Sequence, residues 1–220
     1  ESNQSTLYDI SSLTNILIWL LKASIFVSVI ALMSTLLELQ LLNDIKTNTF
    51  DYDTIEDRAN ANDLRQRIIG LIQIGLFVIT GIIFLRWIYF SNFNSGSLGA
   101  NGMKFTPGWS IGWYFVPFMN FYKPYQAMKE IWKTSKDPNN WQSIETPSLI
   151  KEWWILWIIN SFLGRILYRL PTEEIDEMFL EGVIRIGAEL VSISLSVIAI
   201  KMVSNICEMQ KIHISAATTS

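Results

Sequence analysis

Four long apolar runs constrain this sequence more than any other feature. The first run, residues 13–37, contains Lys22 as its one charged residue. At about 1.5 Å per residue, a helix of this length exceeds the roughly 30 Å hydrocarbon core of a bilayer. Similar runs occupy residues 68–90, 153–168 and 183–203. We therefore expect an all-α integral membrane bundle of four transmembrane helices, forming a single domain over residues 1–220.

The composition points to a membrane protein rather than to a soluble domain. Half of the residues are hydrophobic and nine are Trp, which is more apolar than usual for a soluble chain. The net charge is −3, and the basic residues are scattered along the sequence. This pattern predicts neither a nucleic-acid-binding face nor a polybasic lipid-binding cluster. We expect the lipid bilayer as the main partner, together with a protein partner or a second copy.

The sequence contains few of the residues that common catalytic and metal sites require. Its one histidine, His213, cannot by itself supply a zinc site, a bis-His haem site or a His-based triad partnered within the chain. The motifs GxxxxGK[ST], HExxH and GxSxG do not occur. We therefore expect no catalytic residues, no metal and no cofactor.

The first connection, residues 38–67, is polar and rich in acids. Asp51, Asp53 and Asp57 resemble a calcium loop, but an EF-hand needs Gly at its sixth position and Glu at its twelfth. This chain has Glu56 and Asn62 at those positions. We expect a solvated, partly helical connection rather than a calcium site.

Residues 107–135 combine aromatic side chains with helix-breaking prolines. Thr106 followed by Pro107 predicts a helix start, and a helix over 107–122 would be about 24 Å long, which is short for a membrane span. Pro117 interrupts that helix, and a new amphipathic helix is expected over 124–135. We call residues 107–135 the elbow and expect a re-entrant or interfacial segment between the second and third spans.

The elbow supplies four candidate ligand- or partner-binding residues: Trp113, Asn120, Lys123 and Glu130. We expect the Asn120 amide to bind backbone groups that the prolines leave free. Lys123 is expected to reach the carbonyl end of the half-helix. The elbow either caps the cytoplasmic end of the bundle or forms a binding site, as broken helices do in transporters.

Two charged residues lie within the predicted spans. Lys22 either reaches the membrane interface or faces protein, and Glu189 either pairs with Arg185 or serves a solute or proton path. The segments LIWLLKAS (17–24) and ILWIINSF (155–162) align Lys22 with Asn160. This similarity suggests a degenerate repeat with Asn160 as a polar neighbour of Lys22.

The distribution of charge predicts the orientation in the membrane. Residues 86–152 carry seven Lys or Arg residues against four acids, whereas residues 171–181 carry five acids. The positive-inside rule places the basic region in the cytoplasm, and five crossings would break this rule. We therefore expect four membrane crossings with both termini in the cytoplasm.

A set of elbow residues resembles the signature of a known family. They are Pro107, Trp109, Gly112, Trp113, Phe115, Pro117, Asn120, Lys123, Pro124, Met128, Glu130, Trp132 and Ser135. This run is similar to the bacterial membrane-protein family catalogued as domain of unknown function 4328. The resemblance implies about four membrane helices around the segment, and it implies no activity.

These observations lead to two functional expectations. The first is an integral inner-membrane protein that has no catalytic activity and binds a partner or organises the membrane. The alternative is a small-solute transporter or an oligomeric channel that uses the elbow.

Overall fold

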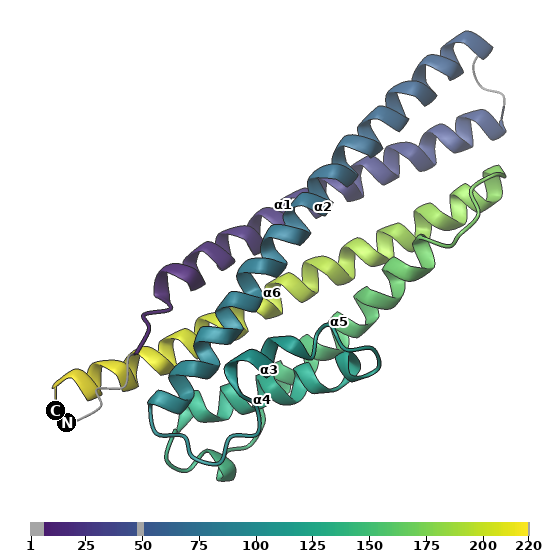
Figure 1. The fold of residues 1–220 in the computed structure, drawn as a ribbon. Helices are drawn as coiled ribbons and strands as arrows, with labels where there is room; N and C mark the ends of the chain where they lie inside the picture. The colour runs from purple at the N-terminus through teal and green to yellow at the C-terminus, as the bar shows by residue number, and fades with distance from the viewer. Residues whose placement is uncertain (1–6, 48–50, 220) are drawn as a thin grey trace. The chain divides into compact units, whose positions relative to one another are not determined.

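The computed structural model describes residues 7–47 and 51–219, which form helices joined by turns and loops, with no strand in these ranges. The helices are α1 (Ser11–Lys46), α2 (Tyr52–Ser97), α3 (Pro107–Gly112), α4 (Lys123–Lys136), α5 (Ser148–Leu167) and α6 (Ile175–Thr219) (Figure 1). Short 3-10 turns lie at Met119–Phe121 and Trp141–Ser143. The all-α class predicted from the sequence is confirmed.

Among the described residues, three helices are long and apolar enough to cross a membrane, namely α1, α2 and α6. They contain the predicted spans 13–37, 68–90 and 183–203. The fourth predicted span falls in α5, where every stretch of 18 residues contains Lys151, Glu152 and Arg165. The structure therefore supports a multi-pass membrane protein.

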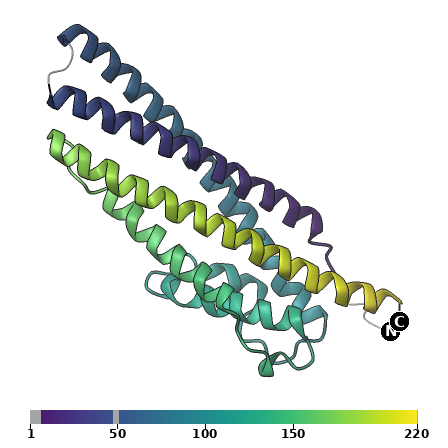
Figure 2. The ribbon, with the colours of Figure 1, turned by 180° about the vertical axis from the view of Figure 1, so that it is seen from behind.

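The first connection is far more helical than we predicted. Helix α1 continues to Lys46, and α2 begins at Tyr52, so most of residues 38–67 belong to two helices that run side by side (Figure 2). Polar pairs between the helices explain the extension. Glu38 accepts a hydrogen bond from Gln66 at 2.8 Å, and Arg58 pairs with Asp44 at 2.9 Å.

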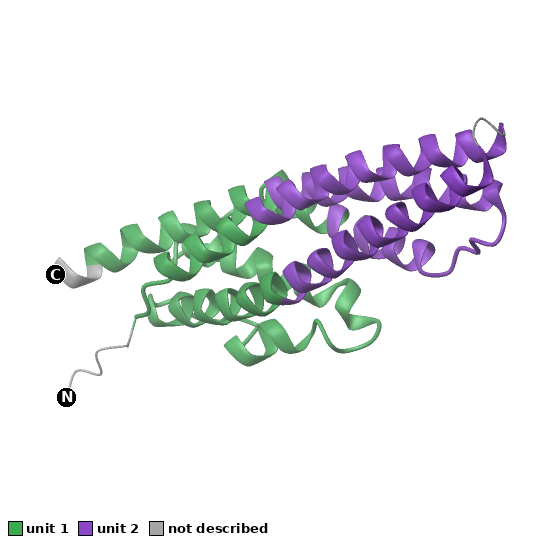
Figure 3. Cartoon of the chain, turned by 90° about the horizontal axis from the view of Figure 1, so that it is seen from above, with its two compact units in different colours: residues 1–21, 79–155, 198–220 green, residues 22–78, 156–197 purple. Residues whose placement is uncertain are grey.

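The chain divides into two compact units, which are coloured separately in Figure 3. Unit 1 comprises residues 1–21, 79–155 and 198–220, and unit 2 comprises residues 22–78 and 156–197. We describe each unit by itself, and the single domain over residues 1–220 stays a prediction.

Unit 1 has an apolar core that includes Trp87, Ile131, Trp153 and Met202, each at most 2% exposed. The Trp87 ring stacks on Phe84, with ring centroids 6.1 Å apart, and its Nε1 donates to the Thr14 hydroxyl at 2.9 Å. Large, fully buried aromatic side chains of this kind contribute much of the stability of a core.

Unit 2 is held by polar contacts in addition to apolar packing. Arg185 pairs with both Glu38 and Glu181, and Arg65 donates to the Ser34 hydroxyl at 2.8 Å. These groups are partly buried, so each charge needs its partner to offset the cost of leaving water.

Candidate functional site

The elbow begins as predicted but turns earlier than predicted. The Thr106 hydroxyl caps α3 by accepting a hydrogen bond from the Trp109 N–H at 3.3 Å, and Pro107 takes the first helical position. Helix α3 then ends at Gly112, so the half-helix predicted over 107–122 is wrong. Pro117 lacks an N–H and disfavours helical geometry in the residue before it, which prevents the helix from continuing through this region.

Phe118 occupies a rare backbone conformation at the tip of the turn. Its φ and ψ angles are 63° and −41°, and the Met119 N–H donates to the Pro117 carbonyl at 2.7 Å. These features define a γ-turn with positive φ, which is uncommon and strained for a residue with a side chain. The Phe118 ring is nevertheless 85% exposed, so packing against the described residues contributes little to hold the conformation.

Helix α4 follows the turn and confirms the helix expected over 124–135. Ala127, Met128 and Ile131 on one face are at most 1% exposed. Lys129 and Lys133 lie on the opposite face and are only partly buried. The apolar face packs against protein within unit 1, whereas we expected a helix that lies in the membrane interface.

Glu130 binds the backbone that leads into the elbow. Its two carboxylate oxygens accept hydrogen bonds from the Lys104 and Phe105 N–H groups at 2.8 Å and 3.0 Å. Burial raises the pKa of Glu130, while these hydrogen bonds and the charge of Lys104 act in the opposite direction. We predicted Glu130 as a ligand or partner residue, and the structure gives its oxygens structural partners.

A buried polar network ties α4 to α2 and α6. Gln210 donates to the Ser91 carbonyl and to the Ser135 hydroxyl, both at 2.9 Å, and it accepts from Asn94 at 3.1 Å. The Thr134 hydroxyl bonds Ser95 at 2.7 Å. Satisfied buried networks of this kind favour one arrangement of the helices, so α4 is a rigid support for the turn.

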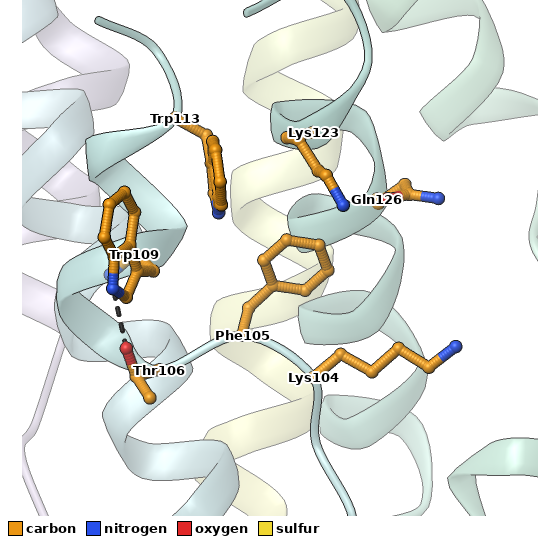
Figure 4. Close-up of a pocket in the computed structure, with 7 residues that line it drawn as sticks. All are labelled: Lys104, Phe105, Thr106, Trp109, Trp113, Lys123 and Gln126. Atoms are coloured by element: carbon orange, nitrogen blue, oxygen red, sulfur yellow. Dashed lines mark hydrogen bonds between the residues drawn. The ribbon is translucent and has the colours of Figure 1, made fainter. Parts of the chain in front are cut away.

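A cavity of about 330 Å³ opens beside α3 and α4 in unit 1 (Figure 4). Its lining consists of Lys104, Phe105, Thr106, Trp109, Trp113, Lys123 and Gln126. The Lys123 ammonium lies 5.5 Å from the centroid of the Trp113 ring and 5.9 Å from that of Phe105. These distances are typical of cation–π contacts, so the two predicted residues Trp113 and Lys123 meet in this pocket.

Asn120 does not make the contacts that we predicted. Its side-chain oxygen is buried and has no hydrogen-bond partner within the described residues. The turn satisfies its own backbone: the Asn120 N–H donates to the Val116 carbonyl, and the Tyr122 N–H donates to the Met119 carbonyl, both at 3.0 Å. The amide is therefore not needed to satisfy these backbone groups.

The turn exposes several large apolar side chains. Those with high exposure are Trp109, Phe115, Phe118, Met119 and Tyr122. Exposed aromatic clusters mark interaction surfaces more often than isolated exposed residues do. We call these five residues the aromatic edge. The sequence showed its aromatic content, but not which rings are left uncovered.

The remaining candidate residues belong to unit 2. Glu189 is buried and accepts a hydrogen bond from Gln73 at 2.7 Å. The predicted alternative partner, Arg185, binds Glu38 and Glu181 instead. Lys22 is exposed and Asn160 is partly buried. The exposure of Lys22 does not support the expectation that this side chain faces protein.

One family model matches this chain. The family is described as Domain of unknown function (DUF4328), and the match covers residues 51–208, including the whole elbow. No curated protein and no solved structure matches the chain.

Proposed function

Because the chain belongs to the DUF4328 family, whose description states no activity, we propose a function from the geometry of the chain itself. The protein is an integral membrane protein of the bacterial inner membrane that has no catalytic activity. It binds a protein partner through the aromatic edge of its elbow.

The proposed topology has four crossings, with α5 as the fourth. Helix α5 has 20 residues, which span about 30 Å at 1.5 Å per residue. Lys151 and Glu152 lie near its start and Arg165 near its end, where long side chains can reach the membrane interface. The excess of Lys and Arg in residues 86–152 then places that region, the interfacial elbow and both termini in the cytoplasm.

Cysteine labelling tests this topology. In a Cys207→Ser background, single cysteines are placed at Asp53, Lys133 and Glu173, and a membrane-impermeant thiol reagent is added to intact membrane vesicles of each orientation. Asp53→Cys and Glu173→Cys should react in vesicles of one orientation, and Lys133→Cys in vesicles of the other. Reaction of Lys133→Cys from the same side as either of the other two positions would contradict four crossings.

The partner-binding proposal rests mainly on the backbone conformation of Phe118. When a bulky residue adopts a conformation that favours glycine, the folded state loses about 1–3 kcal/mol of stability, and such strain concentrates at functional sites. Here the strained residue also exposes 85% of its surface. A partner that covers the ring would gain the apolar burial that the isolated chain does not provide.

The role of Glu130 also supports binding rather than catalysis. A general acid or base must reach the group with which it exchanges a proton. Both oxygens of the Glu130 carboxylate instead accept backbone N–H groups, and the side chain is 4% exposed. Glu130 therefore supports the elbow as part of its framework.

Site-specific photo-crosslinking tests the function. A photoreactive phenylalanine analogue is placed at Phe118, at Tyr122 and, as a control, at Tyr168, which is exposed but lies in unit 2. In native membranes the two elbow positions should give the same crosslinked protein, and Tyr168 should not. Phe118→Ala should reduce crosslinking from position 122 about tenfold, corresponding to roughly 1.4 kcal/mol.

Two outcomes would contradict the proposal. One is the absence of a crosslinked species at both elbow positions, and the other is the same species at all three positions. Mass spectrometry of the crosslinked band then identifies the partner.

The cavity beside Lys123 supports the alternative, a small-solute transporter. In that case Lys123→Ala would abolish flux or ligand-induced stabilisation, whereas a partner-binding protein would show neither with or without the substitution. The variant loses two cation–π contacts under either function, so its free energy of unfolding should fall by about 0.5–2 kcal/mol. Measurements of flux and of ligand-induced stabilisation on wild type and this variant separate the two functions.

A further inference from the structure

A second cavity in unit 1, of about 500 Å³, brings together three lysines from two helices. Lys129 and Lys133 come from α4, and Lys151 comes from the start of α5. The other lining residues are Tyr125, Gln142, Ser143, Ile144, Glu145 and Thr146. The scattered sequence positions predict no basic cluster, whereas the fold assembles one.

The charge in this cavity is not balanced by protein groups. Three lysines and one acidic residue, Glu145, belong to the lining, so it has an excess of two positive charges at neutral pH. None of these four residues takes part in an ion pair with a described residue. Lys129 and Lys133 are also one helical turn apart, which places like charges side by side. An anion in the cavity would relieve this repulsion.

The cavity also offers neutral donors suited to an oxyanion. Tyr125 and Thr146, which carry hydroxyl groups, belong to its lining, and α5 begins at Ser148, two residues after Thr146. The first turn of α5 contains no acid, so the partial positive charge of the helix N-terminus adds to that of the lysines. Ammonium groups together with hydroxyl and backbone donors are the usual ligands of phosphate.

We propose that this cavity binds the phosphate group of an anionic phospholipid. The lipid source rests on the proposed topology, in which α5 enters the membrane just after Lys151. The Tyr125 ring, which belongs to the lining, lies 6.3 Å from the ring of Trp154, so the cavity borders the start of α5, where that helix would enter the membrane. A volume of about 500 Å³ exceeds that of a bare phosphate and suits a headgroup.

The test uses the full chain in neutral detergent and measures binding by thermal stabilisation and native mass spectrometry. The lipid probes are short-chain phosphatidylglycerol and phosphatidic acid, and the soluble probes are glycerol 3-phosphate and inorganic phosphate. The binding variant is Lys129→Gln/Lys133→Gln/Lys151→Gln. The control is Lys136→Gln, which removes one positive charge from the last turn of α4 outside the cavity lining and is therefore matched in charge to the single variant Lys151→Gln.

We expect both lipids to bind wild type and Lys136→Gln with equal affinity, and to bind the triple variant about tenfold more weakly. The affinity should also fall as salt is added, because charge attraction is screened. Lys151→Gln alone gives a milder version of the same loss if the triple variant does not fold.

Two results would overturn the proposal. If the cavity variants that fold bind the lipids with the same affinity as wild type, the lipids do not bind in this cavity. Equal affinity for glycerol 3-phosphate and phosphatidylglycerol would refute the lipid source and indicate a soluble phosphate ligand. Photo-crosslinking at the aromatic edge is independent of both results, so failure of the lipid site and failure of the partner-binding function can be distinguished.

Discussion

Replacing Phe118 by glycine should stabilise the purified protein, although it removes a large aromatic side chain. The residue adopts φ 63° and ψ −41°, which glycine accepts without steric cost. The change therefore relieves a strain of about 1–3 kcal/mol. Since the Phe118 side chain is 85% exposed, the apolar burial that is lost amounts to only about 0.3 kcal/mol.

The stability gained by Phe118→Gly is smaller than the strain relieved, because the substitution also changes the unfolded state. Glycine is more flexible than phenylalanine in the unfolded chain, so folding loses more conformational entropy, at a cost of about 0.5–1 kcal/mol. The net gain is then about 1 kcal/mol, and for a chain of this size it raises the melting temperature by roughly 2–4 °C. Thermal unfolding in detergent, followed by tryptophan fluorescence, measures this shift.

Two control variants separate strain relief from the loss of a ring. Phe118→Ala keeps the Cβ atom and therefore the strain, so its melting temperature should stay close to that of wild type. Phe115→Gly alters a residue that is 72% exposed and has a negative φ, so it should destabilise by about 0.5–1 kcal/mol. A Phe118→Gly protein that melts below wild type, or no higher than Phe118→Ala, would refute the reasoning.

Further variants test the framework around the turn. Glu130→Ala should cost about 1–3 kcal/mol for each of the two backbone N–H groups left unpaired, measured by thermal unfolding. Burial raises the pKa of Glu130 above its ordinary value of 4.5. The free energy of unfolding should therefore fall as the pH rises from 4.5 through the pKa that Glu130 has in the folded protein. Glu130→Gln should remove this pH dependence of the melting temperature. In Gly182→Ala the new Cβ would lie 2.7 Å from Leu39 Cδ2, so the Leu39 side chain must shift. In Gly187→Ala the new Cβ meets no neighbouring side chain, and the variant should be stabilised by about 0.5–1 kcal/mol. We therefore expect Gly182→Ala to melt below Gly187→Ala, and equal melting temperatures would contradict this packing. Asn120→Ala removes a buried oxygen that has no hydrogen-bond partner among the described residues, so a loss of more than about 1 kcal/mol in the same assay would show that the amide is bonded after all.

The apolar runs predicted the positions of the three helices that are apolar enough to cross a membrane, but not the residues at which those helices end. Hydropathy reports which residues tolerate lipid, and it falls at Glu38 although α1 continues to Lys46. The extension depends on partners from the neighbouring helix, such as Gln66 for Glu38 and Arg58 for Asp44. Contacts between residues so far apart in the sequence leave no local signal.

The elbow shows the same division between local and distant causes. The start of α3 at Thr106 and Pro107 and the start of α4 near Pro124 were predictable, because capping and proline chemistry act over a few residues. The early end of α3 and the turn at Phe118 were not. Neither was the use of Glu130 by a backbone segment 25 residues earlier in the chain.

Two features of the elbow that violate local rules lie two residues apart. Phe118 has a strained backbone and is largely uncovered, and the Asn120 oxygen is buried without a hydrogen-bond partner among the described residues. By contrast, Glu130 and Thr134 in the supporting helix have all the hydrogen bonds that a stable framework needs. Natural sequences keep such violations mainly where function requires them, since each one costs stability. We therefore locate the proposed partner contact in the turn around Phe118 and assign α4 the task of holding that turn in place.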